Sequence, residues 1–184
     1  ERSMERLRPL ERLIRDMLLF ARGDSLGRQR FNVCELTAEL AHTLEPVARA
    51  RQVAFTEHCE CGDATLYGDR KSLAGALTNL LENAVQATPA GGAVSLGAAL
   101  KGGEVSFRVS DTGCGMDAAL QERIFQPFFT TRAEGTGLGL AIARGVARGH
   151  GGDIAIASAP GRGTTFTLKL PLAAELAEQT ETQA

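Results

Sequence analysis

The spacing of hydrophobic and polar residues divides the chain into two predicted parts. In residues 2–22, apolar side chains recur every three or four positions, which predicts a single helix. Its narrow apolar stripe is typical of a helix that packs against a partner helix, although a helix folded onto its own domain gives the same pattern over so few turns. Residues 23–30 are predicted to be a linker, residues 31–172 the globular part, and the polar residues 173–184 a disordered tail.

Within the globular part, the apolar period alternates between that of a helix and that of a strand. We predict helices over residues 34–50, 117–125 and 138–148, and a further helix that begins after Asp69. Strands are predicted over residues 31–33, 53–59, 94–98, 105–109, 153–158 and 164–170. Gly102 and Gly103 supply one hairpin turn, and Pro160 and Gly161 another.

The helix after Asp69 carries two asparagines one turn apart. On a helical wheel its leucines and alanines form one apolar face, and Asn79 and Asn83 lie together on the polar side. Because asparagine competes with the backbone inside a helix, a pair of them suggests carboxamides that bind a ligand or an ion. An ordinary exposed polar face is the alternative.

The strand over residues 105–109 ends close to a carboxylate. Val105, Phe107 and Val109 share one face, and Asp111 continues their alternation, which directs its side chain toward the covered side of the sheet. A buried carboxylate needs partners, so we predict that Asp111 accepts a hydrogen bond from a polar ligand. A role in capping the turn at the strand end is the alternative.

Residues 110–140 contain two glycine clusters, separated by a segment too irregular for a core element. Gly113 and Gly115 allow positive φ and a close backbone approach. Gly135, Gly137 and Gly139 lead directly into a helix, whose first amides and dipole favour an anion. This pattern predicts a nucleotide-binding loop.

Composition excludes several classes of partner. The 20 basic and 22 acidic residues give a net charge of -2, so no broad attraction to nucleic acid or to an anionic membrane is expected. No apolar run is long enough to cross a bilayer, and we expect a cytoplasmic location. The four cysteines lack zinc-site spacing and are predicted to be free thiols.

Known phosphate-binding motifs narrow the interpretation further. A Walker A sequence, a dinucleotide-binding motif directly after a strand, and the protein-serine kinase motifs are all missing. Four other segments, in this order, resemble the N, G1, F and G2 boxes of sensor histidine kinases: residues 79–84 (NLLENA), 111–116 (DTGCGM), 125–132 (FQPFFTTR) and 135–140 (GTGLGL). Residues 161–166 (GRGTTF) are similar to the family's final strand, and the resemblance covers residues 31–171.

This resemblance implies a two-layer α/β sandwich of the Bergerat type, with helices on one face of a mixed sheet and ATP bound under a lid. It also implies that residues 1–22 are the second helix of a dimerisation and histidine-phosphotransfer domain, so the whole protein is expected to be a homodimer. The chain starts at Glu1 rather than Met and is expected to be a piece of a longer protein.

The resemblance also implies roles for individual residues. Asp111 would accept from the adenine amine, Asn83 would ligate Mg²⁺, and Asn79 would face the phosphates. Arg132 would meet the terminal phosphate as a fixed positive charge. The remaining ATP contacts are expected from Gly113, Gly115, Gly135, Thr136, Gly137, Leu138, Gly139 and, at the adenine, Thr165.

The implied reaction is transfer of the γ-phosphoryl group of ATP to a histidine, and then to an aspartate of a response regulator. The lid sequence looks most like that of kinases serving nitrogen or flagellar regulators. No histidine of this chain lies in a phosphoacceptor motif, and Gln86 replaces a basic residue common in the family. The alternative is an ATP-hydrolysing or ATP-gated module of the same superfamily, but its base, a glutamate, is replaced here by Asn79.

Overall fold

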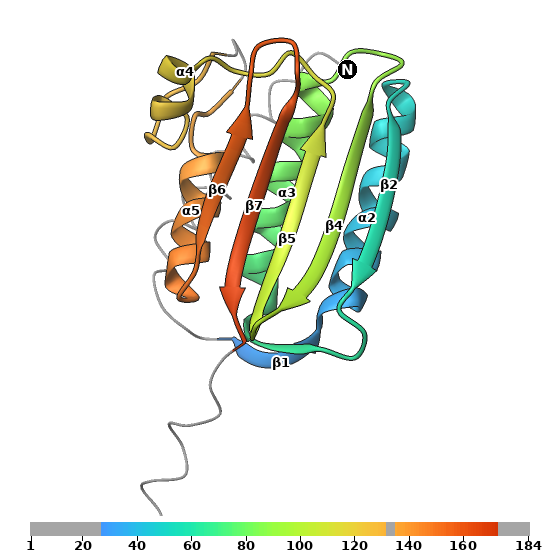
Figure 1. Ribbon diagram of the computed structural model, residues 1–184, viewed down its shortest axis with the longest axis vertical. Helices are drawn as coiled ribbons and strands as arrows, with labels where there is room; N and C mark the ends of the chain where they lie inside the picture. The colour runs from blue at the N-terminus through green and yellow to red at the C-terminus, as the bar shows by residue number, and fades with distance from the viewer. Residues whose placement is uncertain (1–26, 132–134, 173–184) are drawn as a thin grey trace, which may run out of the picture.

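The computed structural model describes residues 27–131 and 135–172. The helix predicted over residues 2–22 and the tail predicted over residues 173–184 lie outside the described residues. The described part is a two-layer α/β sandwich, in which helices cover one face of a mixed sheet (Figure 1), and this confirms the predicted fold class.

The main sheet has five strands in the order β2-β4-β5-β7-β6. They are β2 (Ala54–Glu60), β4 (Ala93–Lys101), β5 (Glu104–Asp111), β6 (Asp153–Ser158) and β7 (Thr164–Pro171). Only the β2 and β4 pair is parallel, and the other neighbours are antiparallel. The Gly102 and Gly103 turn between β4 and β5 has positive φ at both residues, which accounts for the glycines there.

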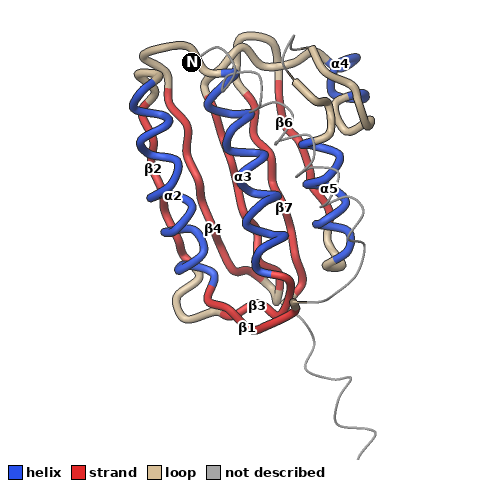
Figure 2. Tube along the Cα trace, turned by 180° about the vertical axis from the view of Figure 1, so that it is seen from behind, coloured by secondary structure: helices blue, strands red, loops and turns tan. Residues whose placement is uncertain are grey.

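Three helices pack on one face of this sheet, as Figure 2 shows from behind: α2 (Val33–Ala50), α3 (Arg70–Ala87) and α5 (Gly139–Gly149). The short α4 (Ala118–Arg123) lies beyond the strand ends near β6. Asn32 caps α2 by accepting from the Glu35 amide, and Asp69 caps α3 by accepting from the Ser72 amide at 3.0 Å, as predicted.

A second, two-stranded sheet lies at one end of the sandwich. In it β1 (Arg28–Asn32) pairs antiparallel with β3 (Thr65–Asp69). The sequence predicted a strand near β1 but missed β3, which is short and whose partner strand in the described part of the chain, β1, is distant in sequence.

The core lies between the sheet and the helices. The inner face of α3 contributes Leu73, Leu77 and Leu80, each 1% exposed or less, which pack in one cluster with Phe107 of β5. Full burial of a leucine stabilises the fold by roughly 1.5–3 kcal/mol. This core therefore holds α3 firmly on β5, the two elements that carry the predicted ligand-binding side chains.

The prediction of four free thiols is wrong for two of them. Cys34, in the first turn of α2, forms a disulfide with Cys59 of β2, while Cys61 and Cys114 are free. Among the described helices, none is both long and apolar enough to span a membrane.

Candidate functional site

A cavity of about 340 Å³ opens at one end of the sandwich, between α3, the ends of β5 and β7, and the segment from Cys114 to Leu140. Its walls carry both polar and apolar side chains. They are formed by Asn83, Gln86, Ala87, Asp111, Cys114, Gly115, Met116, Leu120, Ile124, Phe129, Thr130, Thr131, Gly135, Leu140, Thr164 and Phe166. A volume in this range is typical of a site for a small molecule.

Asp111 ends β5 on the covered side of the sheet, as the alternation predicted, and is 8% exposed. Its Oδ1 accepts from the amide of Gly113 at 2.8 Å and from that of Thr164 at 3.3 Å. Burial raises the pKa of Asp111, and the two amides oppose that rise. Because both bonds fall on Oδ1, Oδ2 is the atom left, among the described residues, to accept from a molecule in the cavity.

The glycines after Asp111 serve mainly to let protein backbones approach one another. An added Cβ at Gly115 would lie 1.9 Å from the carbonyl oxygen of Ala159, and Gly115 has φ +67°. At Gly113 the added Cβ would lie 2.4 Å from the carbonyl oxygen of Ala87. Gly115 lines the cavity, whereas Gly113 supplies its amide to Asp111. Positive φ is therefore required only at Gly115 of this pair.

The two asparagines of α3 occupy different environments. Asn83 lines the cavity, but Asn79 is 8% exposed and its Nδ2 donates to the carbonyl oxygen of Gly139 at 3.2 Å. The alternative of an ordinary exposed polar face is therefore wrong for Asn79, because the start of α5 covers that side of α3. Asn79 fixes the first residue of α5 against α3.

The described residues contain no group of three or more His, Cys, Asp or Glu side chains that could hold a metal ion. A lone carboxamide oxygen, as at Asn83, fits a cation that takes most of its ligands from elsewhere. Magnesium bound to phosphates is of this kind, since it keeps waters and phosphate oxygens and needs only one or two protein ligands.

The second glycine cluster leads from the cavity into α5. Gly135 lines the cavity, and the amide of Leu138 donates to Thr136 Oγ1 at 3.3 Å just before the helix starts. Gly137 has φ +69°, and an added Cβ there would lie 2.4 Å from the backbone of Phe128. The glycine therefore allows the backbone at Phe128 to pack against the loop that precedes α5. We call the described residues 124–131, which include Phe128, the lid. Arg132, predicted to contact a phosphate, lies outside the described residues.

The lid is attached to the rest of the site by aromatic and cationic side chains. Phe125 packs edge-on against Phe166 of β7 with 6.3 Å between ring centroids, and Arg144 of α5 lies over Phe125 at 4.7 Å. Phe128 is an exception: it is 67% exposed and has a left-handed φ of 64°, which is rare for a bulky residue.

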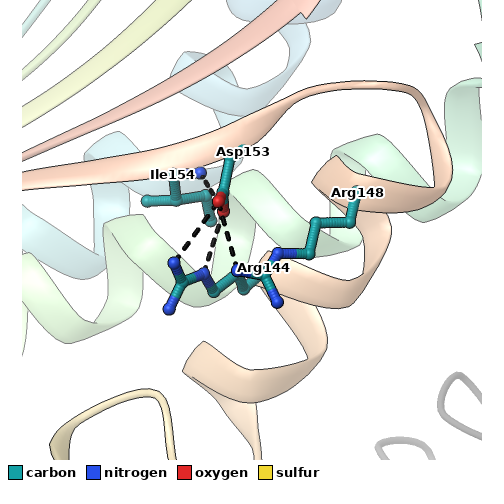
Figure 3. Close-up of polar contacts among 4 residues, drawn as sticks. All are labelled: Arg144, Arg148, Asp153 and Ile154. Carbon is teal, nitrogen blue, oxygen red and sulfur yellow. Dashed lines mark hydrogen bonds and ion pairs between the residues drawn. The ribbon is translucent and has the colours of Figure 1, made fainter.

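The position of α5 is set at its far end by Asp153, the first residue of β6. Figure 3 shows Asp153 between two arginines of α5: Arg144 Nε donates to Oδ1 at 2.9 Å, and Arg148 donates to Oδ2 at 3.2 Å. The guanidinium of Arg144 is the main reason that the pKa of Asp153 is far below its usual range. This link holds α5, and with it the glycine cluster, against the sheet.

We expect the Asp153→Asn chain to lose on the order of 1 kcal/mol of unfolding free energy at pH 7, a small value because the side chain is 46% exposed. A lowered carboxyl pKa stabilises the fold above the unfolded value of 3.8, and that stabilisation is lost as pH falls below it. The difference from wild type in urea unfolding should therefore shrink below about pH 4. Glu104→Gln, which breaks only a surface pair with Lys169, is the control, and equal losses at pH 7 would contradict the assignment.

One predicted contact needs correction. Thr165 does not line the cavity; its Oγ1 pairs with Ser110 Oγ at 2.9 Å on the uncovered face of the sheet. Thr164, the preceding residue, is 6% exposed, lines the cavity and donates its amide to Asp111.

Four of the predicted ligand-binding residues thus line one cavity: Asn83, Asp111, Gly115 and Gly135. Asn79, Gly113 and Gly139 do not line the cavity but support the residues around it through the contacts described above. Sequence reasoning missed the apolar wall, including Met116, Leu120 and Leu140, because hydrophobic residues that line a site look like ordinary core in the sequence.

Known protein families and curated proteins include relatives of this chain. Residues 68–174 match the family described as histidine kinase-, DNA gyrase B-, and HSP90-like ATPase. The signal transduction histidine-protein kinase AtoS of Escherichia coli is 36% identical over 164 residues, which cover 89% of this chain and 27% of AtoS. The sensor protein kinase FleS of Pseudomonas aeruginosa is 41% identical over 171 residues, 93% of this chain and 42% of FleS. The chain thus spans less than half the length of these relatives.

Solved structures of histidine kinases have the same fold as this chain. The nucleotide-free catalytic domain of histidine kinase ThkA has a TM-score of 0.73 at 31% identity, covering 80% of this chain and 97% of that domain. Full-length ShkA in complex with AMPPNP has a TM-score of 0.79 at 32% identity over 90% of this chain and 36% of ShkA. ThkA in complex with the response regulator protein TrrA has a TM-score of 0.77 at 28% identity over 92% of this chain and 49% of that kinase.

Proposed function

The chain belongs to the histidine kinase-, DNA gyrase B- and HSP90-like ATPase family and is an ATP-binding catalytic domain of the sensor histidine kinase type, and from this premise we propose the reaction and the contacts that follow. The domain transfers the γ-phosphoryl group of ATP to a histidine carried outside this chain, and that group then passes to an aspartate of a response regulator.

The observation that carries this proposal is the position of Asp111 in the cavity. Its Oδ2, which the amides of Gly113 and Thr164 do not use, is the proposed acceptor for the exocyclic amine of adenine, and it disfavours guanine, which has an acceptor at the corresponding atom. Met116, Leu120 and Leu140 provide the apolar surfaces that an adenine ring needs on its faces. The amides of Gly113 and Thr164 keep the carboxylate in this orientation.

The phosphates extend from the adenine toward the start of α5. The amides around Gly135 and Gly137 bind them, with the helix dipole of α5 adding a favourable field. The amide of Leu138 joins them by releasing the Thr136 hydroxyl, to which it donates at 3.3 Å. Arg132 supplies a fixed positive charge to the terminal phosphate. Asn79 keeps α5 at the correct distance from Asn83 through its bond to Gly139.

Asn83 is the protein ligand for Mg²⁺, which when bound neutralises charge on the phosphates. The chain itself orients the bound nucleotide and excludes water from the cavity. The lid, which contains Phe125 and Phe129, closes the apolar side of the cavity and directs the terminal phosphate toward an incoming acceptor.

The partner proposed for the whole protein is a response regulator. A related kinase, ThkA, has been solved in complex with its response regulator TrrA. The similarity to FleS supports the narrower proposal that the regulator belongs to the nitrogen or flagellar type. We also propose that the whole protein is a homodimer, through the helix that the sequence predicts for residues 1–22.

The test of this proposal adds a phosphoacceptor histidine on a separate domain. The chain is mixed with a histidine-bearing phosphotransfer domain from a sensor histidine kinase relative, with Mg²⁺ and ATP labelled at the γ position. We expect labelled, acid-labile and alkali-stable phosphate on that domain, and none when its acceptor histidine is replaced by glutamine. Asn83→Ala should require far more Mg²⁺ for the same rate. Rapid release of inorganic phosphate without phosphohistidine would instead favour the ATP-hydrolysing alternative.

A further inference from the structure

The disulfide between Cys34 and Cys59 is not needed to hold a domain of this size together. Disulfides are dense in small secreted domains that lack a sufficient core, whereas this domain has a continuous core in which Leu36, Leu77 and Phe107 are fully buried. Two further cysteines in the described part of the chain stay free. One bridge beside free thiols in a well-packed domain indicates a role other than assembly of the fold.

The disulfide links the start of α2 to the end of β2, so that the two elements form one closed unit. Helix α2 runs into a tight turn and returns as β2, and at the turn the amide of Val53 donates to the carbonyl oxygen of Ala48 at 3.0 Å. The disulfide joins the opposite ends of the two elements, 25 residues apart in sequence, with 5.5 Å between the Cα atoms. Between these two points, Thr37 Oγ1 donates to Glu57 Oε1 at 2.6 Å.

Part of the attachment of both elements lies at this end. Strand β2 is an edge strand that pairs only with β4 within the described sheet. The first turn of α2 follows directly from β1, and Val33 donates to the carbonyl oxygen of Ala64 at 3.1 Å. Opening the bridge would therefore loosen the start of α2, the end of β2 and the small β1 and β3 sheet, while the turn keeps the unit attached.

The local chemistry favours this pair as the reactive one. Cys34 and Cys59 are partly buried, so a small thiol can reach them. Cys34 is the second residue of α2, where the helix dipole favours a thiolate as the leaving group when the bridge is attacked. Cys61 lies two residues from Cys59 but is 6% exposed, and burial raises the pKa of its thiol, so it does not compete as the attacking thiolate.

We propose that Cys34 and Cys59 form a reversible dithiol and disulfide site whose oxidation state sets how firmly α2 and β2 are held at the end of the domain where β1 begins. In the oxidising direction, two thiols and glutathione disulfide give the Cys34–Cys59 bridge and two molecules of glutathione; each cysteine loses one hydrogen, and the glutathione disulfide takes up the two electrons and two protons. A dithiol reductant reverses the reaction.

The site is separate from the cavity. Asp111 pairs with Val94, and Val94 pairs with Phe55 of β2. Cys59 lies four residues further along that strand, about 13 Å away at the usual rise per residue. Reduction is therefore expected to leave nucleotide affinity within about twofold, because no cavity residue contacts the bridge, and this separates the proposal from the kinase function.

The experiment equilibrates the chain in glutathione buffers of different ratios, then traps thiols with iodoacetamide in denaturant. We expect intact mass to rise from two labels to four as the buffer becomes reducing, with the peptides that contain Cys34 and Cys59 linked in the oxidised sample. The thermal unfolding midpoint should fall by roughly 10 °C in the reduced form, as expected for a loop of this length.

Variants identify the pair. Cys34→Ser with Cys59→Ser should unfold near the reduced wild type and show no response to dithiothreitol, while Cys61→Ala with Cys114→Ser should keep the full response. Four labels at every glutathione ratio, a bridge that no ratio reduces, or equal midpoints in both forms would each overturn the proposal. Because the wild-type comparison needs no substitution, a variant that fails to fold does not obscure the result.

Discussion

Replacing Asp111 with asparagine is expected to reduce ATP affinity by at least about 100-fold. The amide oxygen of asparagine can keep the bonds from Gly113 and Thr164, so the local backbone stays in place. Its NH₂ group then occupies the position of Oδ2, where it meets the adenine amine donor to donor. The loss of a charge-assisted acceptor and the new unpaired contact act in the same direction. Calorimetric titration with a non-hydrolysable ATP analogue and Mg²⁺ measures the effect.

The same substitution should not weaken the nucleotide-free fold. Burial raises the pKa of Asp111, so the folded state favours the protonated carboxyl, and this contribution to stability is present at low pH and lost as pH rises through the raised pKa. At pH 7 the ionised side chain therefore lowers stability, and the neutral amide removes that penalty. We expect an equal or higher thermal midpoint without nucleotide and no further rise when nucleotide is added.

A matched control separates loss of the acceptor from loss of charge. Asp63 is exposed in the turn between β2 and β3 and is far from the cavity lining, so Asp63→Asn removes one negative charge without altering the site. This variant should bind the nucleotide as wild type does. Unchanged affinity in the Asp111→Asn chain would show that the adenine lies elsewhere, and the proposed orientation of ATP would then be wrong.

The sequence predicted the buried orientation of Asp111 correctly because the evidence for it is local. Strict alternation through Val105, Phe107 and Val109 continues without a bulge to the last residue of β5, and all three apolar residues are 1% exposed or less. The phase of a regular strand is a property of the chain itself. The helix cap at Asp69 and the hairpin glycines belong to the same class of short-range information.

The errors arose where a second segment decides the outcome. Thr164 and Thr165 are equally plausible from sequence, and only the pairing of Asp111 with Thr164 determines which one faces the cavity. Asn79 lies on the polar side of an isolated helix, but the start of α5, 60 residues away, covers it. The bridge from Cys34 to Cys59 likewise depends on how α2 packs on β2, because cysteine spacing does not specify a partner.

Gly163→Ala should destabilise the domain by about 3 kcal/mol or more and abolish nucleotide binding. An added Cβ would lie 1.9 Å from the carbonyl oxygen of Asp111, and the backbone at Gly163 has φ +73°. The chain can relieve this clash only by moving the start of β7 away from the end of β5. That movement breaks the bond from the Thr164 amide to Asp111 Oδ1 and turns the carboxylate away from the cavity.

Gly161→Ala isolates the effect of the clash from that of the backbone conformation. Gly161 has a nearly equal φ of +71°, but an added Cβ there meets nothing within 4 Å. This variant should lose only the 1–2 kcal/mol or so that a left-handed alanine costs, and it should still bind ATP. Urea unfolding of both variants gives the two free energies, and titration gives the affinities. Equal losses in the two variants would mean that the glycine is required for its φ alone, and that the close contact between β7 and Asp111 does not shape the site.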